Sequence, residues 1–299
     1  MSALQAIQVP AGDGRVLDGR HSDVGGRPVV VLHGGTPSGV AEWPQLEALV
    51  EQAGLGLVTY ARPGYAESTR REGRTVASAA DDTRAVLDHL GVDAVVSLGI
   101  SGGGPHSLAD AAGLGDRCRG AVVVSGLAPM DAPGLDFFEG MGAANQAQFR
   151  TARDDPAAVA TSAEQLRAMT ASLDAAMVKA TAPHTLPPVD AAVMASPLGD
   201  ELAEYLAGTL RSAFSHGVHG LVDDHLSFAQ PWGFDVSAVA GPVTVWHGTA
   251  DESVPVSHGR WIVEHVSDAE GRFLHGHGHV SILAELPAVI DGVASLAMP

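Results

Sequence analysis

The chain has 299 residues, of which 45% are hydrophobic and 17% charged, a composition that fits a globular protein with a sizeable core. Its 17 basic and 35 acidic residues give a formal net charge of −18, which argues against nucleic acid or an anionic membrane as a partner. The single cysteine, Cys118, excludes an intrachain disulfide, and we expect it to be a buried small hydrophobe.

The first residues of the chain carry neither the basic segment nor the apolar segment of a secretory signal. No apolar run approaches the length that a membrane span requires. We therefore expect a cytoplasmic protein with no membrane partner. The sequence leaves its oligomeric state open.

Short apolar runs alternate with helical patterns through the first 124 residues. Runs that are apolar throughout are typical of parallel strands buried on both faces. The predicted strands are Ala6–Val9, Arg15–Arg20, Pro28–Leu32, Leu57–Tyr60, the run that starts at Ala94, and Ala121–Val124. The predicted helices are Glu42–Gln52, Thr75–Leu90 and a segment that ends near Ala112. This alternation predicts a mostly parallel central sheet flanked by helices.

From about Pro129 to about Pro231 the strand pattern is replaced by segments rich in Ala, Met and Leu. We predict an all-helical cap at residues 129–231, inserted into an α/β core made of residues 1–128 and 232–299. The predicted cap helices are Leu135–Phe149, Ser162–Ala171, Leu173–Thr181 and Leu198–Ser215, broken by Pro183, Pro187, Pro188 and Pro197. We expect most of the large apolar side chains to form the core of the cap: Phe137, Phe138, Met141, Phe149, Met169 and Met177.

The α/β pattern resumes after the predicted cap. Pro242–Trp246 is predicted as a buried strand, Gly259–Val266 as a helix and Arg272–Leu274 as a short last strand. Ile282–Leu296 has the spacing of an amphipathic helix that closes the chain.

The pentapeptide Gly99-Ile100-Ser101-Gly102-Gly103 lies where a predicted strand gives way to a helix. It fits the Gly-x-Ser-x-Gly pattern, in which a serine is exposed on a sharp strand-to-helix turn. Small residues are needed on both sides of that serine because the strand and the helix pass close to each other. The alternative interpretation is a glycine-rich turn without chemistry, since a chain with 36 glycines can match the pattern by chance.

Other polar residues follow the predicted strands and should meet the serine at one edge of the sheet, where the carboxyl ends of parallel strands lie. A serine hydroxyl needs a base to accept its proton, and that base needs a third group to orient it. Asp251 and His279 come directly after later strands, in the chain order Ser101, Asp251, His279. The glycine-rich turn at Gly35 could supply one backbone N–H to a reacting oxygen, and Gly102 a second.

Four local blocks together resemble a cap-bearing serine hydrolase of the α/β-hydrolase superfamily. They are Val31–Gly35, Arg62–Tyr65, Gly99–Pro105, and His247–Asp251 with Gly278–Ser281. The resemblance spans nearly the whole predicted core, but the cap matches no particular subfamily.

The resemblance implies a role for each of these positions. Ser101 would be the nucleophile, His279 the general base and then the general acid, and Asp251 the residue that orients His279. Gly35 and Gly102 would form the oxyanion hole, and no cofactor is implied. Ile100, next to the nucleophile, departs from many relatives, which carry a polar or aromatic residue there, so the shape of the pocket stays open.

Several rival assignments remain open from the sequence. Asp131 could be the acid in place of Asp251, and His275 or His277 could be the base in place of His279. A metal site at these three histidines is disfavoured, because no Asp, Glu or Cys joins them locally.

For other polar residues outside the predicted triad we expect roles that are not catalytic. His33, at a strand end beside the Gly35 turn, is expected to be structural. A group at the exit of the cap could reach the pocket, but we expect it to be solvated or to act as a hinge: His216, His219, Asp223, Asp224 and His225.

The nucleophile type restricts the reaction. Haloalkane dehalogenases and epoxide hydrolases of this fold use aspartate at the sharp strand-to-helix turn, which is called the nucleophile elbow. Ser101 at this position therefore disfavours those activities. We expect a carboxylic-ester hydrolase that cleaves a small or medium, largely apolar ester or lactone through an acyl-serine intermediate. Alternatives are a proline iminopeptidase-like enzyme, a carbon–carbon bond hydrolase, a perhydrolase, or a non-catalytic receptor for a small molecule.

Overall fold

The computed structural model describes residues 4–298, and across this range eight strands form one sheet in the order β1-β2-β4-β3-β5-β6-β7-β8. Strand β2 pairs antiparallel with β1 and β4, and the pairs from β4 to β8 are parallel. The strands are β1 Gln5–Pro10, β2 Val16–His21, β3 Val29–His33, β4 Gly56–Tyr60, β5 Val95–Ile100, β6 Cys118–Val124, β7 Val243–Gly248 and β8 Ala269–Leu274. The mostly parallel sheet predicted from the sequence is confirmed.

Helices cover both faces of this sheet because alternate residues of each central strand point to opposite sides. Val29 and Val31 of β3 belong to a cluster that packs under α2, α3 and α10, whereas Val30 and Leu32 pack under α1 and α11. These helices are α1 Pro44–Gln52, α2 Ser78–Leu90, α3 Gly104–Gly113, α10 Val256–His265 and α11 Leu286–Ala297. The core is therefore two apolar layers, one on each face of the sheet.

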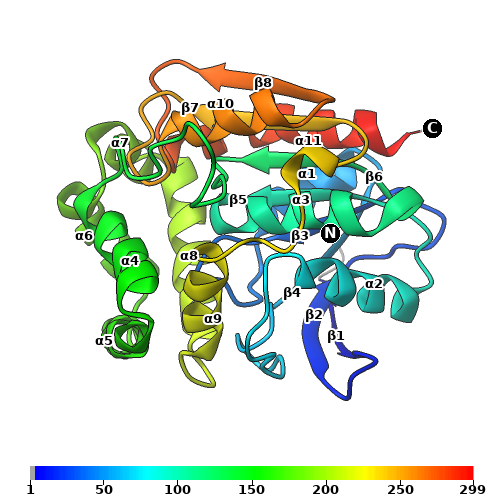
Figure 1. Ribbon diagram of the computed structural model, residues 1–299, viewed down its shortest axis with the longest axis horizontal. Coiled ribbons are helices and arrows are strands. Elements are labelled where there is room, and N and C mark those ends of the chain that lie inside the picture. Colours follow the sequence, from blue (N-terminus) through cyan, green and yellow to red (C-terminus); the bar gives the residue numbers. More distant parts are fainter. Residues whose placement is uncertain (1–3, 299) are drawn as a thin grey trace.

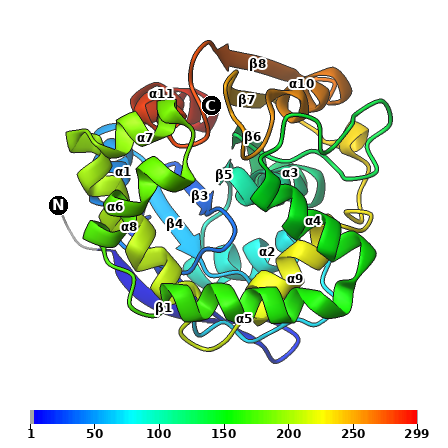
Figure 2. The ribbon, with the colours of Figure 1, turned by 90° about the vertical axis from the view of Figure 1, so that its left-hand side faces the viewer.

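Six further helices lie between β6 and β7 in the chain: α4 Ala143–Asp154, α5 Val159–Thr170, α6 Ala175–Thr185, α7 Pro188–Met194, α8 Pro197–Ala213 and α9 His219–Phe228. Figures 1 and 2 show them gathered at the end of the sheet toward which the parallel strands point. We call residues 143–228 the helical insertion. It lies within the predicted limits of 129 and 231, and the exact domain boundaries stay a prediction.

The insertion differs in detail from the sequence-based prediction. Helix α4 begins at Ala143 rather than Leu135, because Gly140 takes a positive φ of 81° and turns the chain before the helix starts. Helix α6 continues through Pro183, which lies near its C-terminal end and so removes a bond from the last turn alone. Helices α7 and α9 were not predicted at all.

The apolar side chains of the predicted cap fall into two groups. Phe137, Phe138 and Phe149 are buried in the cluster on the α3 face of the sheet, and so is Met141, so they join the insertion to the core. Met169 and Met177 are exposed, at 72% and 43%, because they lie on the outer sides of short helices. The expectation that most of these residues form a core belonging to the cap alone is therefore wrong.

Cys118 is buried, as predicted, and burial raises the pKa of its thiol to about 12. No helix within residues 4–298 is both long and apolar enough to cross a membrane.

Candidate active site

Ser101 lies on a strained turn between β5 and α3. Its φ is +54°, a left-handed conformation that residues with side chains rarely adopt. Glycines on either side make the turn possible: a Cβ on Gly99 would lie 2.3 Å from the carbonyl oxygen of Gly103, and one on Gly103 would lie 2.0 Å from the carbonyl oxygen of His33. The close passage of strand and helix predicted from the pentapeptide is thus present.

The structure brings Ser101, His279 and Asp251 into one hydrogen-bonded chain. The Ser101 Oγ lies 3.0 Å from Nε2 of His279, and Nδ1 of His279 lies 2.8 Å from Oδ2 of Asp251. The second oxygen of Asp251 accepts hydrogen bonds of 2.8 Å from the backbone N–H groups of Ser253 and Val254. These bonds fix the carboxylate so that one oxygen faces the imidazole, which orients the ring toward the serine.

The electrostatics of this chain favour a charged imidazole. Burial by itself would raise the pKa of the Asp251 carboxyl, but the neighbouring imidazole of His279 outweighs it and lowers that pKa. Burial by itself would lower the pKa of His279, but Asp251, and more weakly Asp190, outweigh it and raise that pKa. The site can therefore accept a proton on His279 at little electrostatic cost.

The turn after β3 packs directly against the turn that carries Ser101. A Cβ on Gly35 would lie 3.5 Å from Cβ of Ser101, and a Cβ on Gly102 would lie 2.3 Å from Oγ1 of Thr36. The backbone of Gly35 and the peptide that follows Ser101 therefore flank the serine. Two backbone N–H groups at such positions are the usual donors to an oxyanion.

A buried guanidinium group holds the turn of residues 34–36. Arg62 donates from Nη1 to the carbonyl oxygen of Gly34 and from Nη2 to that of Gly35, both at 2.7 Å, and to Oγ1 of Thr36 at 3.0 Å. The carbonyl of Gly34 and the N–H of Gly35 belong to one planar peptide group and point in opposite directions. Arg62 therefore also fixes the direction of the Gly35 N–H.

Arg62 is itself held by Asp224 of helix α9. Oδ2 of Asp224 accepts from Arg62 Nη2 at 2.6 Å, from Thr36 Oγ1 at 2.6 Å and from the Tyr65 hydroxyl at 2.9 Å. A second guanidinium, Arg74, donates to Oδ1 at 2.5 Å. Burial would raise the pKa of the Asp224 carboxyl, but the two guanidinium charges outweigh it and hold that pKa well below its usual range.

The residues at the predicted cap exit behave differently from expectation. His216 and His219 are exposed, but Asp223, Asp224 and His225 are buried. The expectation of a solvated position is wrong for these three, because they lie in the helix of residues 219–228, most of which is buried. A hinge role for this segment stays a prediction. The sequence contained no local signal for Asp224, because the burial of its partners Arg62 and Arg74 is seen only in the structure.

The alternative candidates for the acid and the base of the triad lie away from the hydrogen-bonded chain in the structure. Asp131 is exposed, whereas Asp251 is the carboxylate bonded to His279. His275 is exposed, and the Nδ1 atom of His277 lies 3.2 Å from the carbonyl oxygen of Ser281. Within residues 4–298, no group of three His, Cys, Asp or Glu residues has a geometry that could hold a metal ion.

His33, expected to be structural, is buried in a separate polar group beneath the Gly35 turn. Its Nε2 lies 2.7 Å from Oδ2 of Asp110, which also accepts from the Ser97 hydroxyl at 2.8 Å. These contacts connect β3, β5 and α3 and leave His33 no direct bond to Ser101 or Asp251 among the described contacts.

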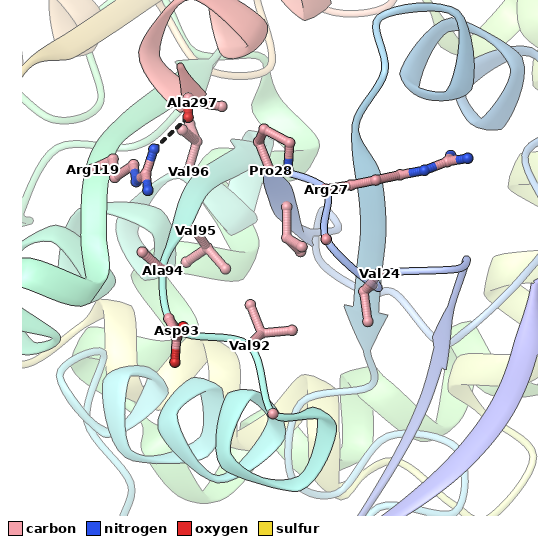
Figure 3. A pocket seen from close by; sticks show the side chains of 13 residues that line it. Val24, Arg27, Pro28, Val92, Asp93, Ala94, Val95, Val96, Arg119 and Ala297 are labelled. Carbon is pink, nitrogen blue, oxygen red and sulfur yellow. Dashed lines mark hydrogen bonds between the residues drawn. The ribbon is translucent and has the colours of Figure 1, made fainter. Parts of the chain in front are cut away.

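A cavity of about 340 Å³ lies at the opposite edge of the sheet, at the amino ends of β3 and β5. Figure 3 shows its lining, with Arg119 bonded to the carbonyl oxygen of Ala297. Ligands of open parallel sheets bind at the carboxyl ends of the strands, where Ser101 lies. The candidate active site is therefore the serine turn rather than this cavity.

Comparison with known proteins decides the family. Residues 27–285 match the family described as the alpha/beta hydrolase fold. The chain belongs to this family. In the solved structure of a thermophilic esterase from Thermogutta terrifontis, the fold is similar over 98% of this chain and 100% of that one, with a TM-score of 0.68 and 19% identity. At that identity the likeness establishes the fold alone.

Two curated relatives match a shorter part of this α/β-hydrolase. An uncharacterised hydrolase of Bacillus subtilis is 33% identical over 111 residues, 36% of this chain. A bifunctional esterase/perhydrolase of Acinetobacter calcoaceticus is 32% identical over 105 residues, 34% of this chain. Each match covers 38% of the length of the relative. The activity of this chain is accordingly argued from its own site.

Proposed function

We propose that the protein is a serine hydrolase that cleaves a small or medium, largely apolar ester or lactone through an acyl-serine intermediate. The observation that carries the proposal is the hydrogen-bonded chain from Ser101 Oγ through the His279 imidazole to Asp251. A strained serine with a positive φ at the end of a central strand is a costly feature, and such strain is concentrated at functional sites. The esterase and hydrolase names of the matched relatives support the same reaction class.

In the first half of the reaction, His279 Nε2 takes the hydroxyl proton as Ser101 Oγ attacks the carbonyl carbon of the substrate. The carbonyl oxygen becomes an oxyanion, which the N–H groups of Gly35 and Gly102 would stabilise. The imidazolium, held by Asp251, then gives its proton to the leaving alcohol. The product of this half is an ester on Ser101.

In the second half, water replaces the alcohol. His279 takes a proton from the water, the resulting hydroxide attacks the acyl carbon, and the proton passes to Ser101 Oγ as the carboxylic acid leaves. For a lactone, both product groups remain in one molecule. The side chain next to the nucleophile, Ile100, packs against an apolar cluster that includes residues of α6 and α8, which favours an apolar acyl group.

Perhydrolysis is a second candidate, because one matched relative is named as both an esterase and a perhydrolase. In this reaction hydrogen peroxide replaces water as the acceptor of the acyl group, and the product is a peracid. Peracid formation from a short carboxylic acid and hydrogen peroxide would test it directly.

The main proposal is tested with p-nitrophenyl butyrate and the Ser101→Ala variant. We expect kcat/KM to fall by about 10⁴-fold or more, the size of loss that removal of a triad serine causes. Ser107→Ala is the matched control: this serine is also buried near the elbow, and its hydroxyl donates to the carbonyl oxygen of Gly104. Tight binding without turnover in both the wild type and Ser101→Ala would instead indicate a receptor, and equal turnover by the two would exclude Ser101 as the nucleophile.

A further inference from the structure

Asp190 of helix α7 is fully buried and contacts the loop that carries His279. Its carboxylate accepts hydrogen bonds from three consecutive backbone N–H groups: those of His279 at 3.0 Å, Val280 at 3.1 Å and Ser281 at 2.7 Å. Successive N–H groups that converge in this way form a concave site for an anion. Here the anion is supplied by the helical insertion, 89 residues before the histidine in the chain.

The loop is shaped to admit this carboxylate. A Cβ on Gly278 would lie 2.6 Å from Oδ1 of Asp190, so the position beside the carboxylate has no room for a side chain. The Gly278 N–H donates to the Ser281 hydroxyl at 2.7 Å, which closes the loop around Asp190. Because His279 lies inside this closed loop, the position of its backbone depends on the carboxylate.

The carboxylate of Asp190 also acts on the imidazole of His279, because its charge helps to raise the pKa of that ring. Among the ion pairs of the described residues, Asp190 has no Lys or Arg partner, so its negative charge is met by backbone dipoles alone. The other ionisable groups that face this region are Asp251 and His247, whose atoms lie 3.5 Å apart. Beside them, His277 and Glu285 lie 3.9 Å apart at the far side of the loop.

We propose that Asp190 is a positioning residue: it holds the loop of residues 278–281 so that the His279 imidazole lies between Asp251 and Ser101. It follows that the helical insertion does more than cover the site. A correctly docked helix α7 is needed for the hydrogen-bonded chain to form. This inference rests on the proposed function for the role of His279, and on the contacts of Asp190 for the mechanism of positioning.

The test compares Asp190→Asn with the matched control Asp200→Asn, which alters an exposed carboxylate of the same insertion, paired with Lys179. Asparagine keeps the size of the side chain but replaces one acceptor oxygen with an NH₂ group, which faces the loop N–H groups as a donor. We expect kcat for p-nitrophenyl butyrate to fall about 10- to 100-fold with KM nearly unchanged, because small misplacements of reacting groups cost factors of this size. The midpoint of the pH–kcat profile should move down, because a negative charge near His279 is lost. Asp200→Asn should match the wild type.

A second measurement separates this inference from the proposed function. The first-order rate constant for inactivation of Ser101 by phenylmethylsulfonyl fluoride reports the activation of the serine even when no ester is a substrate. Molecules that are misfolded and do not refold during the assay lower the amplitude of this reaction but not its rate constant. We expect Asp190→Asn to lower this rate constant at least 10-fold. If esters are not cleaved by the wild type but this difference is found, the function fails and the positioning role stands.

Gly278→Ala provides an independent variant if Asp190→Asn does not fold. Its added methyl group pushes on the same carboxylate from the side of the loop, and we expect a loss of at least 10-fold in the inactivation rate constant. A folded variant of either kind with the kcat, pH profile and inactivation rate constant of the wild type would overturn the proposal. A variant in which only KM changes, while kcat and the inactivation rate constant equal those of the wild type, would also overturn it.

Discussion

Two buried carboxylates of the helical insertion hold the two halves of the candidate active site, and they do so by different chemistry. Asp224 of α9 holds the Gly35 turn through Arg62 and is matched by two guanidinium groups. Asp190 of α7 holds the His279 loop and is matched by three backbone N–H groups. Both side chains are fully buried, at 0% exposure.

The difference shows what each half of the site depends on. Around Asp224 one negative charge is shared by two positive charges, so removing the carboxylate leaves two cations buried. Around Asp190 the partners are neutral, so removing the charge leaves unpaired dipoles and no buried cation. We therefore expect the Asp224 region to dominate folding stability and the Asp190 region to act mainly on catalysis.

Asp224→Asn should give the largest loss of stability. The uncompensated charges of Arg62 and Arg74 should lower the free energy of unfolding by about 3–5 kcal/mol. Chemical denaturation with urea measures this loss. The neighbouring Asp223→Asn is the control, because its partner Arg70 is 31% exposed and water can replace the lost contact.

Asp190→Asn should lower the free energy of unfolding by less than Asp224→Asn does. We expect a loss of about 1–3 kcal/mol, the range for leaving buried hydrogen-bonding groups unpaired. The same urea experiment measures it. A loss equal to that of Asp224→Asn would break the comparison, because the two carboxylates would then be equivalent in folding.

At acid pH the free energies of unfolding of the wild type and Asp224→Asn should become equal. The pKa of Asp224 is well below its usual range in the folded state because the guanidinium charges outweigh burial. Its contribution to stability is thus fully present above the carboxyl pKa of an unfolded chain, about 3.9, and is lost as the pH falls through the folded-state pKa. Urea unfolding at a series of pH values should show the gap between the two proteins shrinking below about pH 4. A difference in the free energy of unfolding that stays constant down to the lowest pH measured would contradict the ion-pair account.

The pH dependence of catalysis should reflect the pKa of His279, in the half of the site that Asp190 holds. Burial lowers the pKa of His279, but Asp251 and then Asp190 outweigh it and raise that pKa. Activity should rise as the imidazolium loses its proton, with a midpoint above the ordinary histidine pKa of about 6.5. A pH–kcat/KM profile on p-nitrophenyl butyrate measures this midpoint, and a value below 6.5 would contradict the assignment of charges around His279.

Tyr65→Phe should have the smallest effect. It removes one neutral donor from Asp224 and leaves both guanidinium partners in place. We expect a loss of about 0.5–1.5 kcal/mol in the free energy of unfolding, the net value of one hydrogen bond. The melting temperature and urea midpoint check it, and a loss as large as that of Asp224→Asn would mean that the hydroxyl, rather than the charges, holds the network.

The parts of the site that sequence could predict are those encoded by local patterns. Ser101 follows from glycines at fixed offsets, because only they allow the strand and helix to pass so closely. Asp251 and His279 follow from their place after predicted strands, since such residues share one edge of a parallel sheet. The two apolar faces of the sheet follow from unbroken apolar runs such as Val29–Leu32.

Asp190 and Asp224 could not be found in this way. Each lies on a short helix of the insertion that was not predicted, and each meets partners far away in the chain. No local pattern distinguishes a carboxylate that receives three backbone N–H groups from one that faces water. The choice is made by packing between the insertion and the core, which periodicity does not describe. The same packing buried Phe137 and Phe138 against the sheet rather than inside a separate cap.

The central claim is that His279, oriented by Asp251, activates the hydroxyl of Ser101. Mass spectrometry after treatment with phenylmethylsulfonyl fluoride tests it most directly. We expect one sulfonyl adduct per chain, located on Ser101, absent from Ser101→Ala and formed far more slowly in His279→Ala. An adduct on another residue, or equally fast labelling of Ser101 in His279→Ala, would contradict the account.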